Sequence, residues 1–256
     1  MDSTSNLPIR LLVASVAVTS LLWCSLVQAA ECDGEAVLSK LDARLNTARD
    51  LDLNIEILNQ IPGKTDRTMR MSVRTRGHKR FTEFQAPGDV KGTKVLSLSR
   101  SKMYVYLPAY QKVRRITSHT TDQGFMGTTL SQDDMATTHY GQVYAATSCS
   151  QEGDHYVVEA NPRSDAQVAY GRAVFKLSLA KTLPQEIRYF SPSGKHVKTE
   201  SRAEYECRGE YCNPNSITMT DHTRAGAKTT LRVTSWKKDT SFPESVFSKR
   251  NLQRER

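Results

Sequence analysis

The chain has 256 residues, of which 38% are hydrophobic and 25% are charged, and its formal net charge at pH 7 is +9. This length is enough for one large domain with a substantial core. The positive charge favours anionic partners such as phospholipid head groups, lipopolysaccharide or an acidic protein face. We expect no nucleic-acid partner, because the N-terminus has the pattern of an export signal.

That N-terminal pattern is an uncharged, mostly apolar run at residues 11–27, which follows Arg10. A membrane anchor is the alternative, but the run is about 17 residues long and a comfortable span needs ~20. Val27 and Ala29 occupy the small-residue positions of a cleavage site. We therefore predict a signal peptide at residues 1–29 and a single domain at residues 30–256.

The predicted mature chain contains four cysteines, and an even number in an exported protein predicts two disulfides. Cys207 and Cys212 are close enough in sequence to close a tight hairpin. Three pairings of the four cysteines are possible, and this one leaves Cys32 to bond Cys149. A zinc site is the alternative, but no histidine lies at ligand spacing beside the short cysteine pair, so we predict neither a metal nor any other cofactor.

The first half of the mature chain begins with a helical pattern and continues with short strands. Apolar residues at helical spacing predict an amphipathic helix at 35–48. Alternating apolar and basic residues predict a strand at 68–76, and a turn leads into another at 80–84. Residues 95–99 and 103–107 form a predicted hairpin.

A short basic run at 112–116 follows that hairpin, and a Thr/Ser-rich loop comes after it. Residues 131–135 read as a helix start, with two acidic side chains near the positive end of the helix dipole.

The second half is a series of strand candidates separated by proline- and glycine-bearing turns, and a short terminal helix is predicted at 244–252. The candidates are residues 155–160, 168–178, 186–191, 196–205, 216–221 and 229–236. The fold class is therefore α+β but mainly β, with one strongly twisted antiparallel sheet. Because so few helices are available, either the sheet closes on itself or the helices cover it, and both arrangements leave a long apolar interior.

Several short motifs in a fixed order resemble the LolA-like family of outer-membrane lipoprotein-sorting proteins. They are P-x-DVKGT at 87–93, YLPA at 106–109, RRI at 114–116, FMGT at 125–128 and DDM at 133–135. The resemblance extends over residues 35–252, nearly all of the mature chain. The four cysteines are not part of this pattern.

The resemblance implies an incomplete β-barrel of about eleven antiparallel strands, covered by helices that enclose a hydrophobic cavity. It also implies a periplasmic, non-catalytic carrier of lipid or lipoprotein acyl chains. Its expected partners are those chains, a lipid-exporting inner-membrane transporter and, transiently, a membrane surface.

Apolar residues at strand spacing, together with the apolar pair of the FMGT motif, are the candidates for lining such a cavity. They are Met69, Met71, Leu96, Leu98, Met103, Val105, Leu107, Phe125 and Met126. The flexible methionines could adapt to chains of different shape. The alternative for each of these residues is that it simply fills the core.

Charged residues near the predicted cover are the candidates for lid or head-group contacts. Arg114 and Arg115 could anchor a lid, bind helix-end carbonyls or contact a phosphate, and the alternative is a solvated surface charge. Asp133 and Asp134 are expected to cap a helix, and otherwise to pair with those arginines.

No motif for catalysis is present: the sequence contains no G-x-S-x-G, H-E-x-x-H, P-loop or Rossmann glycine pattern. We therefore predict that the protein is not an enzyme. The alternatives to a carrier are a sensor similar to RseB-like envelope-stress regulators, and an accessory subunit that braces an exporter.

Overall fold

The computed structural model describes residue 1 and residues 32–254, apart from 100, 117–123, 132, 133, 136, 138 and 167. The chain divides into two compact units, Met1–Glu31 and Cys32–Arg256. The predicted signal peptide and its cleavage site fall outside the described residues, so they stay predictions. Within the described part of the chain, no helix is both long and apolar enough to cross a bilayer.

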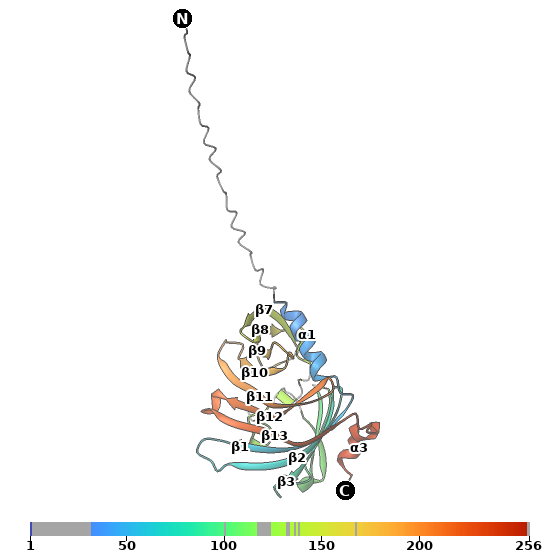
Figure 1. Cartoon of the computed structure of the whole chain (residues 1–256). Coiled ribbons are helices and arrows are strands. Elements are labelled where there is room, and N and C mark those ends of the chain that lie inside the picture. The colour runs from blue at the N-terminus through green and yellow to red at the C-terminus, as the bar shows by residue number, and fades with distance from the viewer. Residues whose placement is uncertain are drawn as a thin grey trace. The chain divides into compact units, whose positions relative to one another are not determined.

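One antiparallel sheet of thirteen strands, in the order β6-β5-β4-β3-β2-β1-β13-β12-β11-β10-β9-β8-β7, dominates the described part of the chain (Figure 1). The strands are β1 Leu51–Gln60, β2 Arg67–Arg76, β3 Lys79–Ala86, β4 Lys94–Ser99, β5 Lys102–Leu107, β6 Lys112–Ile116, β7 Tyr144–Glu152, β8 His155–Pro162, β9 Arg172–Ser178, β10 Pro184–Phe190, β11 His196–Arg208, β12 Tyr211–Asp221 and β13 Ala227–Lys238. β6 and β7 are the two edges, so the sheet does not close into a barrel. The predicted fold class is confirmed.

The register shows which side chains share the inner, concave face. Ile55 of β1 pairs with Met71 of β2, and Met71 pairs with Phe84 of β3. Directly paired residues of an antiparallel sheet project to the same side, and successive residues project to opposite sides. The period-2 pattern of β1 to β3 therefore builds a continuous apolar inner surface.

Helix α1 (Gly34–Leu45) covers the inner face at the β7 end of the sheet, where it contacts β7 and β8 (Figure 1). Asp33 begins the helix, and its carboxylate accepts a hydrogen bond from the Ala36 N–H at 3.1 Å. Leu38 and Leu41 are fully buried in a core cluster with Val158 and Phe175. This amphipathic helix thus covers the part of the inner face beside β7 and β8.

The C-terminal segment lies on the opposite, outer face. It consists of a 3₁₀ turn, η4 (Glu244–Phe247), and the short helix α3 (Lys249–Leu252). Phe247 and Leu252 are buried against Phe81, Leu96 and Tyr104 of β3 to β5. Further 3₁₀ turns are η1 (Pro108–Tyr110), η2 (Phe125–Gly127) and η3 (His222–Arg224).

Most predicted elements are present with shifted ends, and the first helix ends at Leu45 rather than at residue 48. The helix start predicted at 131–135 lies partly outside the described residues. Three strands, β1, β6 and β7, were not predicted as strands, and the thirteen strands exceed the roughly eleven that the family resemblance implied. Pro214, expected to separate strands, lies inside β12 opposite Tyr205. The neighbouring Glu204 has a φ of 56°, so the backbone is irregular at this point of β11.

The buried carboxylate of Asp50 joins the start of β1 to the end of β13. It accepts hydrogen bonds from the backbone and hydroxyl of Thr240, from the Ser241 N–H and from Arg76, at 2.5 to 3.2 Å. Its side chain is fully buried. Burial acts to raise the pKa of Asp50, but the hydrogen bonds from Thr240, Arg76 and Arg49 outweigh it and lower the pKa below the usual value.

We predict that Asp50→Ala lowers the free energy of unfolding by about 3–5 kcal/mol, because it leaves buried donors and Arg76 without their acceptor. The control Asp89→Ala removes a largely exposed carboxylate that pairs with Arg67. That variant should lose less than about 1 kcal/mol in urea unfolding. Equal losses in the two variants would contradict the role assigned to Asp50.

The same contacts predict a pH dependence of stability. Because the native pKa of Asp50 is lowered, its contribution is complete above the ordinary value of 3.8 and is lost as the pH falls through the native pKa. Asp50→Asn, which resembles the protonated acid, should be less stable than the wild type near neutral pH. This difference should shrink as the pH is lowered, and a constant difference would contradict the assignment.

Candidate functional site

A cavity of about 360 Å³ lies against the inner face where α1 does not cover it. Its walls are β1 to β5 on one side and β11 to β13 on the other. The apolar lining consists of Leu45, Ala48, Leu51, Leu53, Ile55, Met71, Val73, Phe84, Val95, Met103, Phe125, Leu130, Met135, Pro214, Ile217, Met219, Leu231 and Val233. This volume falls within the range of small-ligand sites.

The cover of the cavity comes from the described parts of residues 124–140 and from the end of α1. Thr129 binds this cover to the sheet: its N–H donates to the Thr229 hydroxyl at 2.8 Å and its hydroxyl donates to the Met219 carbonyl at 2.9 Å. Asp42 of α1 accepts the backbone N–H groups of Tyr140 and Gly141 at 2.6 and 2.8 Å. The cover is therefore attached by hydrogen bonds to both the sheet and α1.

A buried ion pair between Glu200 and Arg202 lies in the β11 wall, with 2.5 Å between Oε1 and Nε. Arg202 also donates to the Tyr140 hydroxyl at 2.5 Å, and the Tyr189 hydroxyl donates to Glu200 at 3.0 Å. Burial acts to lower the pKa of Arg202, but the Glu200 carboxylate outweighs it and raises the pKa well above the usual value. Burial raises the pKa of Tyr140, so this tyrosine stays neutral.

Asp134 forms reciprocal hydrogen bonds with Ser131 in the segment that covers the cavity, and its predicted role as a helix cap stays a prediction because part of this segment lies outside the described residues. The Ser131 N–H donates to its carboxylate at 2.7 Å, and its own N–H donates to the Ser131 hydroxyl at 3.2 Å. Lys198 and the Tyr170 hydroxyl also donate to this carboxylate, at 2.7 and 2.6 Å. Asp133 lies outside the described residues.

Arg80 is a further charged residue of the lining, on the inner face of β3. Its Nη1 donates to the Met135 carbonyl of the cover at 2.5 Å. Burial lowers the pKa of Arg80, and the nearby Arg202 lowers it further.

The structure places the predicted ligand-binding residues in three groups. Met71, Met103 and Phe125 line the cavity. Val105 pairs with Val95 and so lies on the same face, but it is outside the lining, as are Met69, Leu107 and Met126. Leu96 and Leu98 project to the outer face and pack against the C-terminal segment.

Arg114 and Arg115 lie on the edge strand β6, and neither lines the cavity. Arg114 lies over the Tyr110 ring at 5.8 Å, and Arg115 donates to the Ser101 carbonyl at 3.2 Å. The alternative prediction paired these arginines with Asp134, but the described partners of Asp134 are Lys198, Tyr170 and Ser131. The role of Arg114 and Arg115 in a lid or at a head group stays a prediction.

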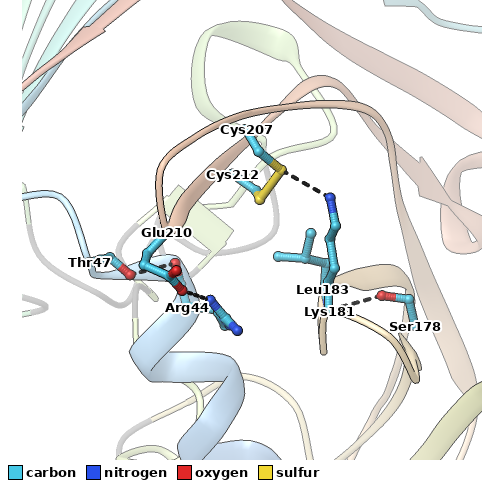
Figure 2. The surroundings of a disulfide bond; sticks show 8 residues. All are labelled: Arg44, Thr47, Ser178, Lys181, Leu183, Cys207, Glu210 and Cys212. Carbon is cyan, nitrogen blue, oxygen red and sulfur yellow. Dashed lines mark hydrogen bonds and ion pairs between the residues drawn. A yellow bond between two sulfur atoms is a disulfide. The ribbon is translucent and has the colours of Figure 1, made fainter.

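Both predicted disulfides are confirmed, Cys32 with Cys149 and Cys207 with Cys212. The second closes the β11–β12 hairpin beside the end of α1 (Figure 2). There Arg44 of α1 forms an ion pair with Glu210 at the hairpin tip, and Lys181 Nζ lies 3.6 Å from Cys207 Sγ. Tyr211, the next residue of this hairpin, lines the cavity.

The described residues contain no cluster of three or more histidine, cysteine or acidic side chains that could hold a metal ion. Histidines approach each other in pairs: the His78 and His139 rings are 4.6 Å apart, and the His196 and His222 rings are 4.3 Å apart. We assign neither pair a ligand.

Sequence reasoning missed two contributions to the lining. The strand β1 supplies Leu51, Leu53 and Ile55, and their alternation with Asp52 and Asn54 is a strand signal that could have found them. The wall from β11 to β13 brings Glu200 and Arg202 beside β3, and no local pattern announces this contact.

We predict that the two disulfides contribute unequally to stability, because they close loops of different length. Loop-closure entropy gives about 5 kcal/mol for the long loop between Cys32 and Cys149 and about 2 kcal/mol for the short one. The double variant Cys32→Ser/Cys149→Ser should therefore unfold at lower urea concentration than Cys207→Ser/Cys212→Ser. The reverse order would contradict this ranking.

The comparisons with known proteins concern both the sequence and the fold. A family model described as "-like: Uncharacterized protein" matches residues 76–254. A search of the curated proteins finds no match. Three solved structures have similar folds, and each covers 86% of this chain.

The first is a domain from Vibrio parahaemolyticus with a provisional assignment as an outer membrane lipoprotein-sorting protein, at 24% identity, a TM-score of 0.78 and 98% coverage of that chain. The second is a DUF1329 family protein from Desulfovibrio piger, at 21% identity, a TM-score of 0.77 and 97% coverage of that chain. The third is a LolA superfamily protein from Nitrosomonas europaea, at 18% identity, a TM-score of 0.71 and 99% coverage of that chain. The chain therefore belongs to the family of the matching model, and its fold is the LolA-like fold that its motifs predicted.

Proposed function

We propose that this protein is a non-catalytic periplasmic carrier, which holds acyl chains of a lipid or lipoprotein in the inner cavity and passes them to an acceptor. The observation that carries this proposal is the apolar cavity on the part of the inner face that α1 leaves uncovered. The LolA-like fold and the lipoprotein-sorting assignment of the structural neighbour from Vibrio support it.

The energetics favour a site of this kind. Each CH₂ group of a lipid chain costs ~0.8 kcal/mol to leave in water, so a sixteen-carbon chain costs on the order of 12 kcal/mol. A carrier must hide most of that chain. The inner surface can do so because Ile55, Met71 and Val73 already face one another across neighbouring strands.

The location and the partners belong to the same proposal. Two disulfides are typical of a protein from an oxidising compartment, and this supports export to the periplasm by the predicted signal peptide. We propose transient contact with anionic membrane surfaces through the net positive charge, and delivery to or from an inner-membrane lipid exporter.

The proposal is tested on protein purified from its native envelope without detergent. Extraction and mass spectrometry should recover an acyl-containing molecule in a defined ratio to the protein, and the emptied protein should take up a fluorescent fatty acid. A protein that contains no acyl ligand and takes up none would overturn the proposal.

We predict that Ile55→Trp blocks uptake by filling the cavity. The side chain of Ile55 is part of the lining, whereas the neighbouring Asn54 is exposed on the outer face of the same strand. Ile55→Trp should weaken fatty-acid binding at least about tenfold, and Asn54→Trp should leave it unchanged. Equal binding by the two variants, each folded by circular dichroism, would place the ligand elsewhere.

A further inference from the structure

The charged side chains of the cavity lining are unevenly compensated. Glu200 pairs with Arg202 at 2.5 Å, and Asp134 pairs with Lys198 at 2.7 Å. Arg80 has no carboxylate within ion-pair distance among the residues that the structure describes. Arg80 is therefore a cation of the described lining that has no carboxylate as an ion-pair partner.

The contact that Arg80 does make leaves its charge uncompensated. Its Nη1 donates to the Met135 carbonyl, which uses one of the five guanidinium N–H groups. A carbonyl is neutral, so the positive charge remains. Burial is the largest cause of the lowered pKa of Arg80; Tyr140 acts to raise this pKa, and the neighbouring Arg202 lowers it.

The position of Arg80 directs this charge toward the cavity. In the register Arg80 pairs with Thr75 of β2 and Ser97 of β4, and all three residues belong to the lining. The next inward residues of the same strand, Thr82 and Phe84, continue the wall, which becomes apolar at Phe84. A charged group at one point of a largely apolar cavity is the arrangement that an amphiphile requires.

Leaving a charge in such surroundings is expensive unless an anion approaches it. The planar guanidinium matches carboxylate and phosphate oxygens in a two-point contact, which gives it geometric selectivity for those groups. A volume of about 360 Å³ is near the lower end of ligand sites, which suits one chain better than several.

We propose that Arg80 is the head-group site of the cavity and binds the carboxylate or phosphate of a single-chain anionic amphiphile, whose chain lies along β1 and β2. This inference rests on the proposed carrier function and names the class of its ligand. The chain would contact Ile55, Met71 and Val73, while the head group replaces the missing counter-ion of Arg80.

The test compares ligands that share a ten-carbon chain and differ in the head group. Decanoate, decyl phosphate and the neutral decanol are titrated at pH 8 against the delipidated full-length mature protein, with displacement of a fluorescent fatty acid as the readout. A charge-assisted contact predicts that the two anions bind about tenfold to a hundredfold more tightly than decanol. Equal affinities would overturn the head-group site and leave the carrier function standing, whereas no displacement by any of the three ligands would contradict the carrier function itself.

The variants assign the preference to one residue. Arg80→Gln should bind decanol as the wild type does and lose the preference for the anions, and Arg80→Lys should retain part of it. The matched control is Arg70→Gln, an exposed arginine on the outer face of β2, which should keep the full preference. A preference for the anions that persists in Arg80→Gln would overturn the proposal. If that variant does not fold, the proposal is tested by the affinities of the wild-type protein for the two anions and for decanol.

Acetate and inorganic phosphate, which carry the same charged groups without a chain, form the final arm. Neither should displace the fluorescent ligand at the concentrations where decanoate and decyl phosphate do. Displacement by inorganic phosphate at those concentrations would identify a free-anion site and would contradict the proposal.

Discussion

The structure depends on how one large apolar surface is removed from water. An open sheet of thirteen strands has a curved inner face, and the described chain supplies one long helix to cover it. Leu38 and Leu41 of α1 fill the part beside β8 and β9, where a tight core forms. The part beside β1 to β5 lies under the end of α1 and the described parts of residues 124–140, and it contains the cavity. A ligand site thus follows from a shortage of covering helices.

Polar contacts maintain this incomplete cover without filling the cavity. Asp42 attaches residues 140 and 141 to α1, and Thr129 attaches the turn before them to β12 and β13. At the other end of the walls, Asp50 joins the first and last strands. These hydrogen bonds support the rim of the cavity together with packed side chains of the cover, such as Phe125 and Met126 against Phe84.

The sequence predicted the fold class and the disulfides better than the site. Alternation along β2 to β5 is a local signal, and two cysteine pairs follow from export and spacing, so both could be read directly. The lining could not, because a sheet has two faces and alternation does not say which one is inward: Leu96 turned out to pack against the C-terminal segment, whereas Met103 lines the cavity. The approach of Arg202 to Arg80 depends on long-range strand order, which no local pattern contains.

The central claim is that an acyl chain lies inside the sheet, between β1 to β3 and β11 to β13. A crystal structure with a fatty acid brominated at the end of its chain tests this claim most directly, because the anomalous signal of bromine locates that end. We predict a bromine peak among the apolar lining residues, beside Met71 or Val73. A bromine peak on the outer face or at the edge strands, with no electron density for a chain in the cavity, would contradict the account.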